Sequence, residues 1–357
     1  MNAAAKNYDG VNKYIRITDI DEASSTYTDK DIVSPDGILT DNYLVNNRDI
    51  LLARTGASTG KSYLYKQSDG KLYYAGFLIR ANVTTHDPYF VFSQLHTHRY
   101  WRWVSIMSAR SGQPGINSQE YSSFPIYTTS IEEESKIAKL LFLLDERIAT
   151  QNKIIEDLKM LKSAIIEIEY TPNTKTTSHI GNVIEQISKR NKNNTIQNVL
   201  SVSNRQGFIK QSDQFENRNV ASEDTSNYKI VEKNDFAFNP ARINVGSIAR
   251  LTTFEKGIIS PMYICFRTQE NVAPEYIDFF FESKHFYCEI QKRLEGSVRQ
   301  CLSFEGLCNI PFSLPSLEMQ QRIGKRLFTL GQKIKTETDL LELLNKQKQY
   351  LLRQMFI

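Results

Sequence analysis

The chain has 357 residues, 40% of them apolar and 24% charged, with a formal net charge of +4, which is enough material for two domains with their own cores. The mild positive charge permits nucleic-acid binding without requiring it. No apolar run approaches the ~18 residues of a membrane span and no signal-like segment follows Met1, so we expect a cytoplasmic protein without a membrane partner.

Residues 1–128 are expected to form a first head of mixed strands and helix. Alternation of apolar and polar residues predicts a strand at 13–20, and apolar runs predict two more at 49–53 and 77–83. Residues 88–110 then have the pattern of one helix, which begins at a proline. The turn-rich stretch that follows leads into a long helical segment.

That long segment, residues 129–170, repeats apolar side chains at steps of three and four, the 3.5-residue period of a helix seam. Ser130 occupies the N-cap position, and Glu133 is placed to complete a capping box. The predicted seam consists of Ile137, Leu141, Leu144, Ile148, Ile155, Leu158 and Ile165.

The second half of the chain repeats the first at an offset of 186 residues. A polar linker at 171–178 opens a linker and second head at 171–313, and a second spacer helix is expected at 314–357. Polar interruptions repeat too, since Gln151 falls on Glu337 and Lys162 falls on Lys348. The second seam consists of Ile323, Leu327, Leu330, Ile334, Leu341, Leu344 and Leu351.

Two stripes with the same apolar and polar pattern are most simply each other's partner. The expected fold is therefore α+β, with two tandem mixed α/β heads separated by a long antiparallel two-helix coiled coil, pseudo-two-fold symmetric. Forty residues at ~1.5 Å each give a rod of roughly 60 Å. At the 186-residue offset the start of the second head would precede Met1, so the first head is expected to begin short of the repeat.

No catalytic or metal-binding residues are predicted. The glycine-rich turn at 56–62 has three residues instead of four before its Gly-Lys-Ser, and a strand follows it where a phosphate-binding loop needs a helix. Asn239-Pro240 lacks the second proline and the aromatic residue of an amino-methyltransferase site. The cysteines form no CxxC pair, and the histidines form no recognisable catalytic or zinc motif.

The loops of the two heads differ more than their frames, which favours two related recognition tasks. Arginine pairs well with guanine and glutamine with adenine in the DNA major groove, and lysine and hydroxyl groups suit phosphates. An exposed hairpin turn and solvated helix ends remain the alternative interpretation. The candidate DNA contacts are Arg54, Thr55, Ser58, Thr59, Lys61, Arg110, Ser111, Gln113, Arg242, Asn244, Ser297, Arg299 and Gln300.

The whole pattern resembles the specificity subunits of type I restriction–modification systems. The residues that carry the resemblance are DILLARTGASTGKSYLY at 49–65, SGQPGIN at 111–117, FPIYTTSIEEESKIAKLLFLLDERI at 124–148, and the ending LLRQMFI at 351–357, with their repeats. The resemblance spans nearly the whole chain and joins loop, helix and repeat at fixed spacing.

The resemblance implies that each head is a target-recognition domain for one half of a bipartite double-stranded DNA sequence. It also implies that the coiled coil docks two methyltransferase subunits, which motor–nuclease subunits then join. S-adenosylmethionine, ATP and Mg²⁺ would belong to those partners, and this chain would be a non-catalytic scaffold without a cofactor.

Two other classes of function compete with this interpretation. The chain could be a coiled-coil adaptor whose heads bind proteins, or an enzyme in its own right, for which the sequence offers no nucleophile, metal or cofactor constellation. A steep loss of binding with rising salt would separate DNA recognition from the adaptor, because phosphate contacts release counterions.

Overall fold

The computed structural model describes residues 1–109, 113–171, 177–204, 206–214, 224–296 and 300–356. The chain forms two compact units, Met1–Ile154 with Glu337–Ile357, and Ile155–Thr336. Each unit combines one head with part of both long helices. The compact units do not coincide with the predicted segments, because each unit contains residues from both halves of the chain. The predicted boundaries between heads and spacer helices therefore stay predictions.

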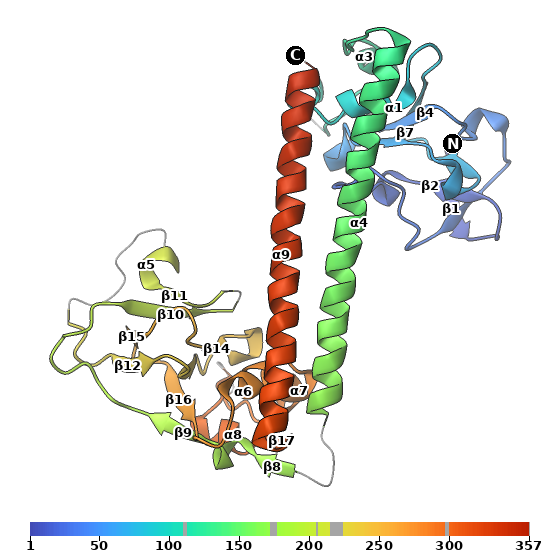
Figure 1. Ribbon diagram of the computed structural model, residues 1–357. Helices are drawn as coiled ribbons and strands as arrows, with labels where there is room; N and C mark the ends of the chain where they lie inside the picture. Colours follow the sequence, from blue (N-terminus) through green and yellow to red (C-terminus); the bar gives the residue numbers. More distant parts are fainter. Residues whose placement is uncertain (110–112, 172–176, 205, 215–223, 297–299, 357) are drawn as a thin grey trace. The chain divides into compact units, whose positions relative to one another are not determined.

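The first head is built from short strands and short helices (Figure 1). Its central sheet has the order β5-β4-β7, with antiparallel pairing throughout, while β2 pairs parallel with β6 and β1 antiparallel with β3. Its elements are β1 (Ala4–Asn7), β2 (Lys13–Ile15), β3 (Val33–Asp36), β4 (Asp49–Ala53), β5 (Ser62–Leu64), β6 (Leu72–Tyr74), β7 (Leu78–Asn82), α1 (Pro88–Gln94), α2 (His98–Met107) and α3 (Ser118–Ser122).

Strand β4 is buried along its whole length and separates two apolar clusters. Leu51 and Ala53 pack into one cluster, and Ile50 and Leu52 pack into the other. Successive side chains of a strand point to opposite faces, so an apolar run such as this one can fill the core on both sides of the sheet.

The single helix expected over residues 88–110 is wrong, because two helices occupy this stretch. The first, α1, begins at Pro88 and ends at Gln94. Thr97 then starts a new helix: its hydroxyl accepts a hydrogen bond from the Tyr100 N–H at 3.2 Å and donates to the Gln94 carbonyl at 2.7 Å. A residue that caps one helix while bonded to the end of another makes a corner instead of a continuous rod.

The second head contains two four-stranded sheets, β11-β10-β15-β12 and β14-β13-β16-β9, and the antiparallel pair β17-β8. Its elements are β8 (Thr177–His179), β9 (Ile184–Ile187), β10 (Val199–Ser203), β11 (Gly207–Lys210), α5 (Gln211–Gln214), β12 (Lys229–Glu232), β13 (Phe236–Phe238), β14 (Ile248–Arg250), β15 (Lys256–Ile259), β16 (Ile264–Thr268), α6 (Pro274–Phe280), α7 (Lys284–Gln291), α8 (Phe304–Cys308) and β17 (Pro311–Ser313).

The 186-residue repeat is a repeat of structure. Helices α6, α7 and α8 begin 186 residues after α1, α2 and α3, and the pairing Ile50↔Leu64 in β4–β5 recurs as Phe236↔Arg250 in β13–β14. One part of the expected linker is wrong, because β8 falls inside 171–178 and pairs with β17. Strand β9 pairs with β16, whereas in the described part of the first head β7 pairs only with β4.

The two long helices, α4 (Ile131–Tyr170) and α9 (Leu317–Met355), also begin 186 residues apart. In the first unit Asp145 binds Lys348 at 2.6 Å and Gln151 binds Glu337 at 2.5 Å, so α9 residues fall in number as α4 residues rise. The helices are therefore antiparallel, as expected (Figure 1). Within the second unit, Ile165 of α4 and Ile323 of α9 join one core cluster.

The face that each long helix buries follows the 3.5-residue period. Leu141 is 1% exposed, whereas its neighbour Leu140 is 46% exposed. All fourteen predicted seam residues are buried or partly buried. Neither these helices nor any other helix in the described ranges has the length and apolar character needed to cross a bilayer.

Candidate nucleic-acid interface

The connection between β4 and β5, residues 54–61, contains many of the candidate contacts of the first head. Gly60 adopts φ +94°, and a Cβ at this position would lie 2.7 Å from Val104 Cγ1 on α2. Only glycine fits both the left-handed conformation and this close approach. The loop therefore lies directly against the helix that supports it.

Two buried tyrosines hold this loop from the core side. The Tyr121 hydroxyl donates to the Ala53 carbonyl at 2.6 Å and accepts from the Gly60 N–H at 3.1 Å. The Tyr100 hydroxyl donates to the Gly60 carbonyl at 2.8 Å. Burial raises the pKa of Tyr121 to about 12, so both phenols stay protonated donors at neutral pH.

A second segment, residues 113–116, lies against the same loop. The Ile116 N–H donates to the Arg54 carbonyl at 2.9 Å, and the Gly56 N–H donates to the Pro114 carbonyl at 2.9 Å. The side chains of Arg54 and Gln113 are exposed. The fold thus brings together two candidate contacts that are far apart in the sequence, while Arg110 and Ser111 lie outside the described residues.

The remaining candidates of this loop are less available. Thr59 is 7% exposed, and its hydroxyl donates to the Gly56 carbonyl at 2.8 Å, which shapes the turn. Lys61 binds Glu22 at 3.2 Å and is only 18% exposed along its side chain. Thr55 and Ser58 are half-buried. Among the described candidate contacts of the first head, Arg54 and Gln113 are therefore the ones with exposed side chains.

The second head builds the same frame with different side chains. The Leu302 N–H donates to the Pro240 carbonyl at 3.1 Å, which is the Ile116–Arg54 bond shifted by 186 residues. Arg242 is exposed on this loop and Asn244 is half-buried. Gln300 is exposed on the segment that leads to Leu302, and Ser297 and Arg299 lie outside the described residues.

The supports beneath the two loops are not the same. Phe286 and Leu307 stand at the positions of Tyr100 and Tyr121, and neither carries a hydroxyl. The second loop is instead tied by its own residue Asn239, whose side-chain oxygen accepts from the Ala241 N–H at 3.1 Å. The loops can therefore differ in shape although both leave the same pair of strands.

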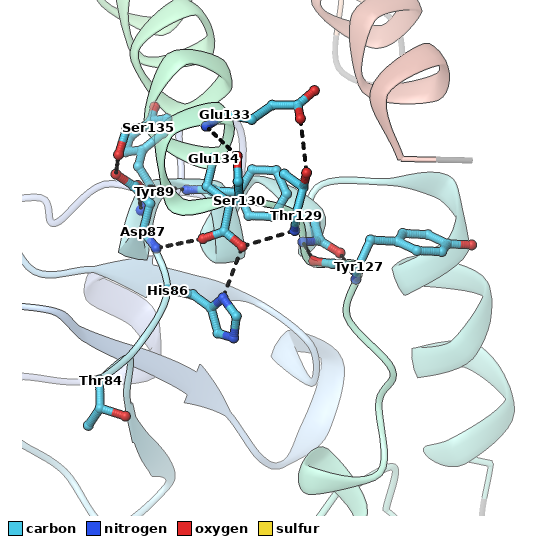
Figure 2. A network of polar contacts seen from close by, with 12 residues as sticks. Thr84, His86, Asp87, Tyr89, Tyr127, Thr129, Ser130, Glu133, Glu134 and Ser135 are labelled. Atoms are coloured by element: carbon cyan, nitrogen blue, oxygen red, sulfur yellow. Dashed lines mark hydrogen bonds and ion pairs between the residues drawn. The ribbon is translucent and has the colours of Figure 1, made fainter.

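A buried carboxylate fixes the first head to the start of α4. Glu134 is fully buried and accepts hydrogen bonds from the Asp87 N–H at 3.0 Å and the Thr129 N–H at 3.3 Å, and it contacts His86 Nδ1 at 2.9 Å (Figure 2). Burial raises the pKa of this carboxyl, but the three hydrogen bonds outweigh burial and the pKa is lowered overall. Glu134 is therefore ionised at neutral pH.

The second head uses an amide at the equivalent joint. Gln320, which lies 186 residues after Glu134, accepts from the Ala273 N–H at 3.0 Å and donates to the Pro315 carbonyl at 2.9 Å. Each joint satisfies the backbone N–H of the residue before an equivalent helix, Asp87 before α1 and Ala273 before α6. The orientation of each head on its helix start is thus set by one buried side chain.

Sequence reasoning identified the two loops but not the residues that position them. The supporting roles of Tyr121, Glu134 and Gln320 depend on partners distant in sequence, and no local pattern marks them. The repeat offset offered one signal, because Glu134 and Gln320 are polar residues on the apolar side of matching first turns.

Fold and loops together define a class of protein, in which a duplicated scaffold of head and helix carries two loops with the same backbone frame and different side chains. Residues 1–160 and 165–346 match the family described as "Type I restriction modification DNA specificity domain", and the chain belongs to this family. It is therefore a non-catalytic specificity subunit, the DNA-recognition part of a type I restriction–modification enzyme.

Two relatives with similar sequences are both named as specificity subunits. The chain is 23% identical over 339 residues to the type I restriction enzyme MjaVIII specificity subunit of Methanocaldococcus jannaschii, covering 86% of this chain and 76% of that one. It is 24% identical over 301 residues to the putative MjaX specificity subunit of the same organism, covering 77% and 67%.

Solved structures share the fold. The type I restriction–modification S subunit from M. genitalium aligns with a TM-score of 0.62 at 15% identity, covering 98% of this chain and 89% of that one. A chain from a structure on complex assembly and conformational transition of the type I system aligns with a TM-score of 0.52 at 15% identity, covering 96% and 90%.

Proposed function

We propose that the first head reads one half of a bipartite DNA target through Arg54 and Gln113, and that the second head reads the other half through Arg242 and Gln300. The observation that supports this assignment is the shared backbone frame, which presents an exposed arginine and an exposed glutamine in each head. Arginine and glutamine are donors that pair with the major-groove edges of guanine and adenine.

The same proposal includes the partners of the chain. Two methyltransferase subunits dock on the coiled coil, and motor–nuclease subunits complete the assembly. S-adenosylmethionine, ATP and Mg²⁺ are bound by those partners, while this chain supplies the DNA sequence preference.

The test is selection from a DNA library randomised in both half-sites, using the full chain assembled with its methyltransferase subunits. Arg54→Ala should relax base preference in one half-site and Arg242→Ala in the other, each at a cost of about 1–3 kcal/mol at the affected position. A substitution that changed preferences in both halves would contradict the two-reader arrangement. An affinity for DNA that did not change with salt concentration would instead favour a protein-binding adaptor.

A further inference from the structure

The second head carries a basic loop that the recognition loops do not use. Residues 188–194 read Ser-Lys-Arg-Asn-Lys-Asn-Asn, with three cations and no carboxylate. Residues 188–193 line an open groove of 940 Å³ together with Thr195, Ile196, Ile230 and Lys256, and this described lining contains no acidic side chain. Lys189, Arg190 and Lys192 are exposed there.

This loop is held in a fixed shape from beneath. Asn191 is 2% exposed, its side-chain oxygen accepts from the Ile196 N–H at 3.2 Å, and its side-chain nitrogen donates to the Ile196 carbonyl at 3.0 Å. The Asn191 N–H donates to the Tyr228 carbonyl at 3.0 Å. Because the buried asparagine fixes the backbone, the neighbouring cations are presented without the cost of ordering the loop on binding.

The cations of this loop form no close ion pair in the described part of the chain, and the carboxylate that attracts Lys189 from a longer distance, Glu232, is itself paired with Lys256. Within the described part of the chain, no carboxylate lies within ion-pair distance of Lys189 or Lys192, while Arg190 donates to the Asn227 side chain at 2.9 Å. Lys256, on the rim, is paired with Glu232 at 3.0 Å. A rigid, acid-free groove lined by lysine, arginine and asparagine has the chemistry of a polyanion site.

The first head does not repeat this feature. At the 186-residue offset, Lys189 and Arg190 fall on Ala3 and Ala4, and Lys256 falls on Gly70. Lys192 falls on Lys6, which lies 3.9 Å from Asp36. At these equivalent positions, all of them described, the first head therefore lacks the set of cations that lines the groove of the second head.

We propose that the groove formed by Lys189, Arg190 and Lys192 binds phosphates of the DNA backbone and gives the second head a sequence-independent hold on the duplex. The inference rests on the proposed DNA-reading function and extends it to a site away from the recognition loops. DNA is favoured as the occupant because cations and amides line the groove while its two isoleucines, Ile196 and Ile230, are not exposed.

The experiment measures binding of the full chain, assembled with its methyltransferase subunits, to a fluorescent duplex of about 30 base pairs of arbitrary sequence across a salt series. Replacing Lys189 and Lys192 together by alanine should reduce the slope of log affinity against log salt by about 2. The advantage of the parent over the variant should then shrink by about tenfold between about 50 and 200 mM salt.

Lys6→Ala is the matched control, since it removes the lysine at the equivalent sequence position of the first head, and it should leave the slope unchanged. The double glutamine variant, Lys189→Gln with Lys192→Gln, keeps a polar side chain without the charge and should behave like the double alanine variant. Library selection with either double variant should return the parent's base preferences.

An unchanged slope in folded double variants would overturn the inference, and so would loss of methyltransferase subunits with unchanged DNA binding, which would make the groove a protein interface. These outcomes are separable from failure of the proposed function. If the parent showed no base preference in the library, the two-reader proposal would fail, whereas the salt slope would still report on the groove.

Discussion

Tyr121 connects the core of the first head to its recognition loop through one hydroxyl group. That oxygen serves both the Ala53 carbonyl and the Gly60 N–H, at the two ends of the loop that carries Arg54. A phenol in this place fixes the separation of the loop ends, and so the direction in which the loop leaves the sheet. The position of the Arg54 side chain depends on the position of the loop backbone that carries it.

Tyr121→Phe should therefore affect both stability and recognition. Removing the hydroxyl leaves the Ala53 carbonyl and the Gly60 N–H with the 3.1 Å hydrogen bond that they make to each other. Because neither group is left without a partner, the free energy of unfolding should fall by about 0.5–1.5 kcal/mol. Base preference should relax in the half-site assigned to Arg54 only. Denaturant unfolding and library selection measure the two effects.

Tyr65→Phe is the control, because it removes a hydroxyl that donates to the Gly70 carbonyl at 2.9 Å, away from the recognition loop. It should leave base preference intact. Unchanged specificity in Tyr121→Phe would show that the tyrosine supports the fold and not the reading of DNA.

His96 gives the first unit an acid-sensitive contact. Burial, and to a smaller extent the positive charge of Lys348, lower the pKa of His96 to about 4, against the opposing effect of Asp145. The neutral ring donates from Nδ1 to the Phe92 carbonyl at 3.0 Å and accepts at Nε2 from the Ser25 hydroxyl at 3.0 Å. The folded state therefore binds a proton less readily than the unfolded state, in which histidine titrates near its ordinary value of about 6.5.

As the pH falls from about 6.5 to about 4, the unfolded state binds a proton at His96 that the folded state does not bind. The free energy of unfolding therefore falls over this pH range. We expect His96→Gln to flatten this part of the stability profile, whatever its effect at neutral pH. Melting temperatures measured from pH 7 to 4 test this, with His98→Gln, an exposed neighbour, as the control. Parallel profiles for parent and His96→Gln would exclude His96 as the titrating group.

At the scale of elements, periodic patterns predicted the long helices because a 3.5-residue repeat is a local property of the sequence. Ser130 caps α4 as expected, its hydroxyl accepting from the Glu133 N–H at 3.4 Å. The capping box is wrong, because the Glu133 carboxylate accepts from the Thr129 hydroxyl instead, at 2.9 Å. Thr97 likewise divides the predicted helix into α1 and α2 through the hydrogen bonds of its hydroxyl group, which the spacing of apolar residues does not predict.

The recognition surface was harder to predict than the helices. The glycine-rich turn was visible as a turn, but the contact between Arg54 and Ile116 depends on how the strands pair. The burial of Thr59 and the pairing of Lys61 with Glu22 also arise only in the folded head. Residue type and spacing indicated candidate loops for DNA contact, which stay a prediction, while the exposure of each side chain in the folded head shows which candidates are accessible.

Two adjacent leucines on α4 allow a sharp test of the coiled coil. Leu141 is buried with Ala138 and Leu352, whereas Leu140 is 46% exposed. Leu141→Ala should cost about 2–5 kcal/mol of unfolding free energy through lost burial and the cavity left behind. Leu140→Ala should change it by no more than about 0.5 kcal/mol.

Chemical denaturation of both variants supplies the comparison. Since the two substitutions delete the same atoms from neighbouring positions of one helix, helix propensity cancels between them. Equal losses would mean that the buried face of α4 has been assigned incorrectly.

For the whole molecule, the division into two compact units bears on how Arg54 and Arg242 contribute to the free energy of DNA binding. Arg54 and Arg242 belong to different compact units, and their backbone carbonyls accept from different residues, Ile116 for Arg54 and Ser247 for Arg242. Substitutions at distant sites without common partners usually add within about 0.3–0.5 kcal/mol. The two arginines should therefore contribute to DNA binding independently.

The double variant Arg54→Ala/Arg242→Ala should lose the sum of the two single losses in binding free energy on a fully matched duplex. Titrations of parent, both single variants and the double variant complete the cycle. A coupling energy above about 1 kcal/mol would show that engagement of one half-site assists the other.

The contact between Gln151 and Glu337 joins two residues that occupy the same position of the duplicated sequence. In a homodimer of single repeats, this position would face its own copy: two second repeats would oppose two carboxylates, and two first repeats would oppose two amides. The amide–carboxylate pair avoids the like-charge repulsion and gains a charge-assisted hydrogen bond. Because the two repeats are joined in one chain, the residues at this position can differ, as Gln151 and Glu337 do. After a tandem duplication the two halves can therefore change independently while α4 and α9 keep the same pairing.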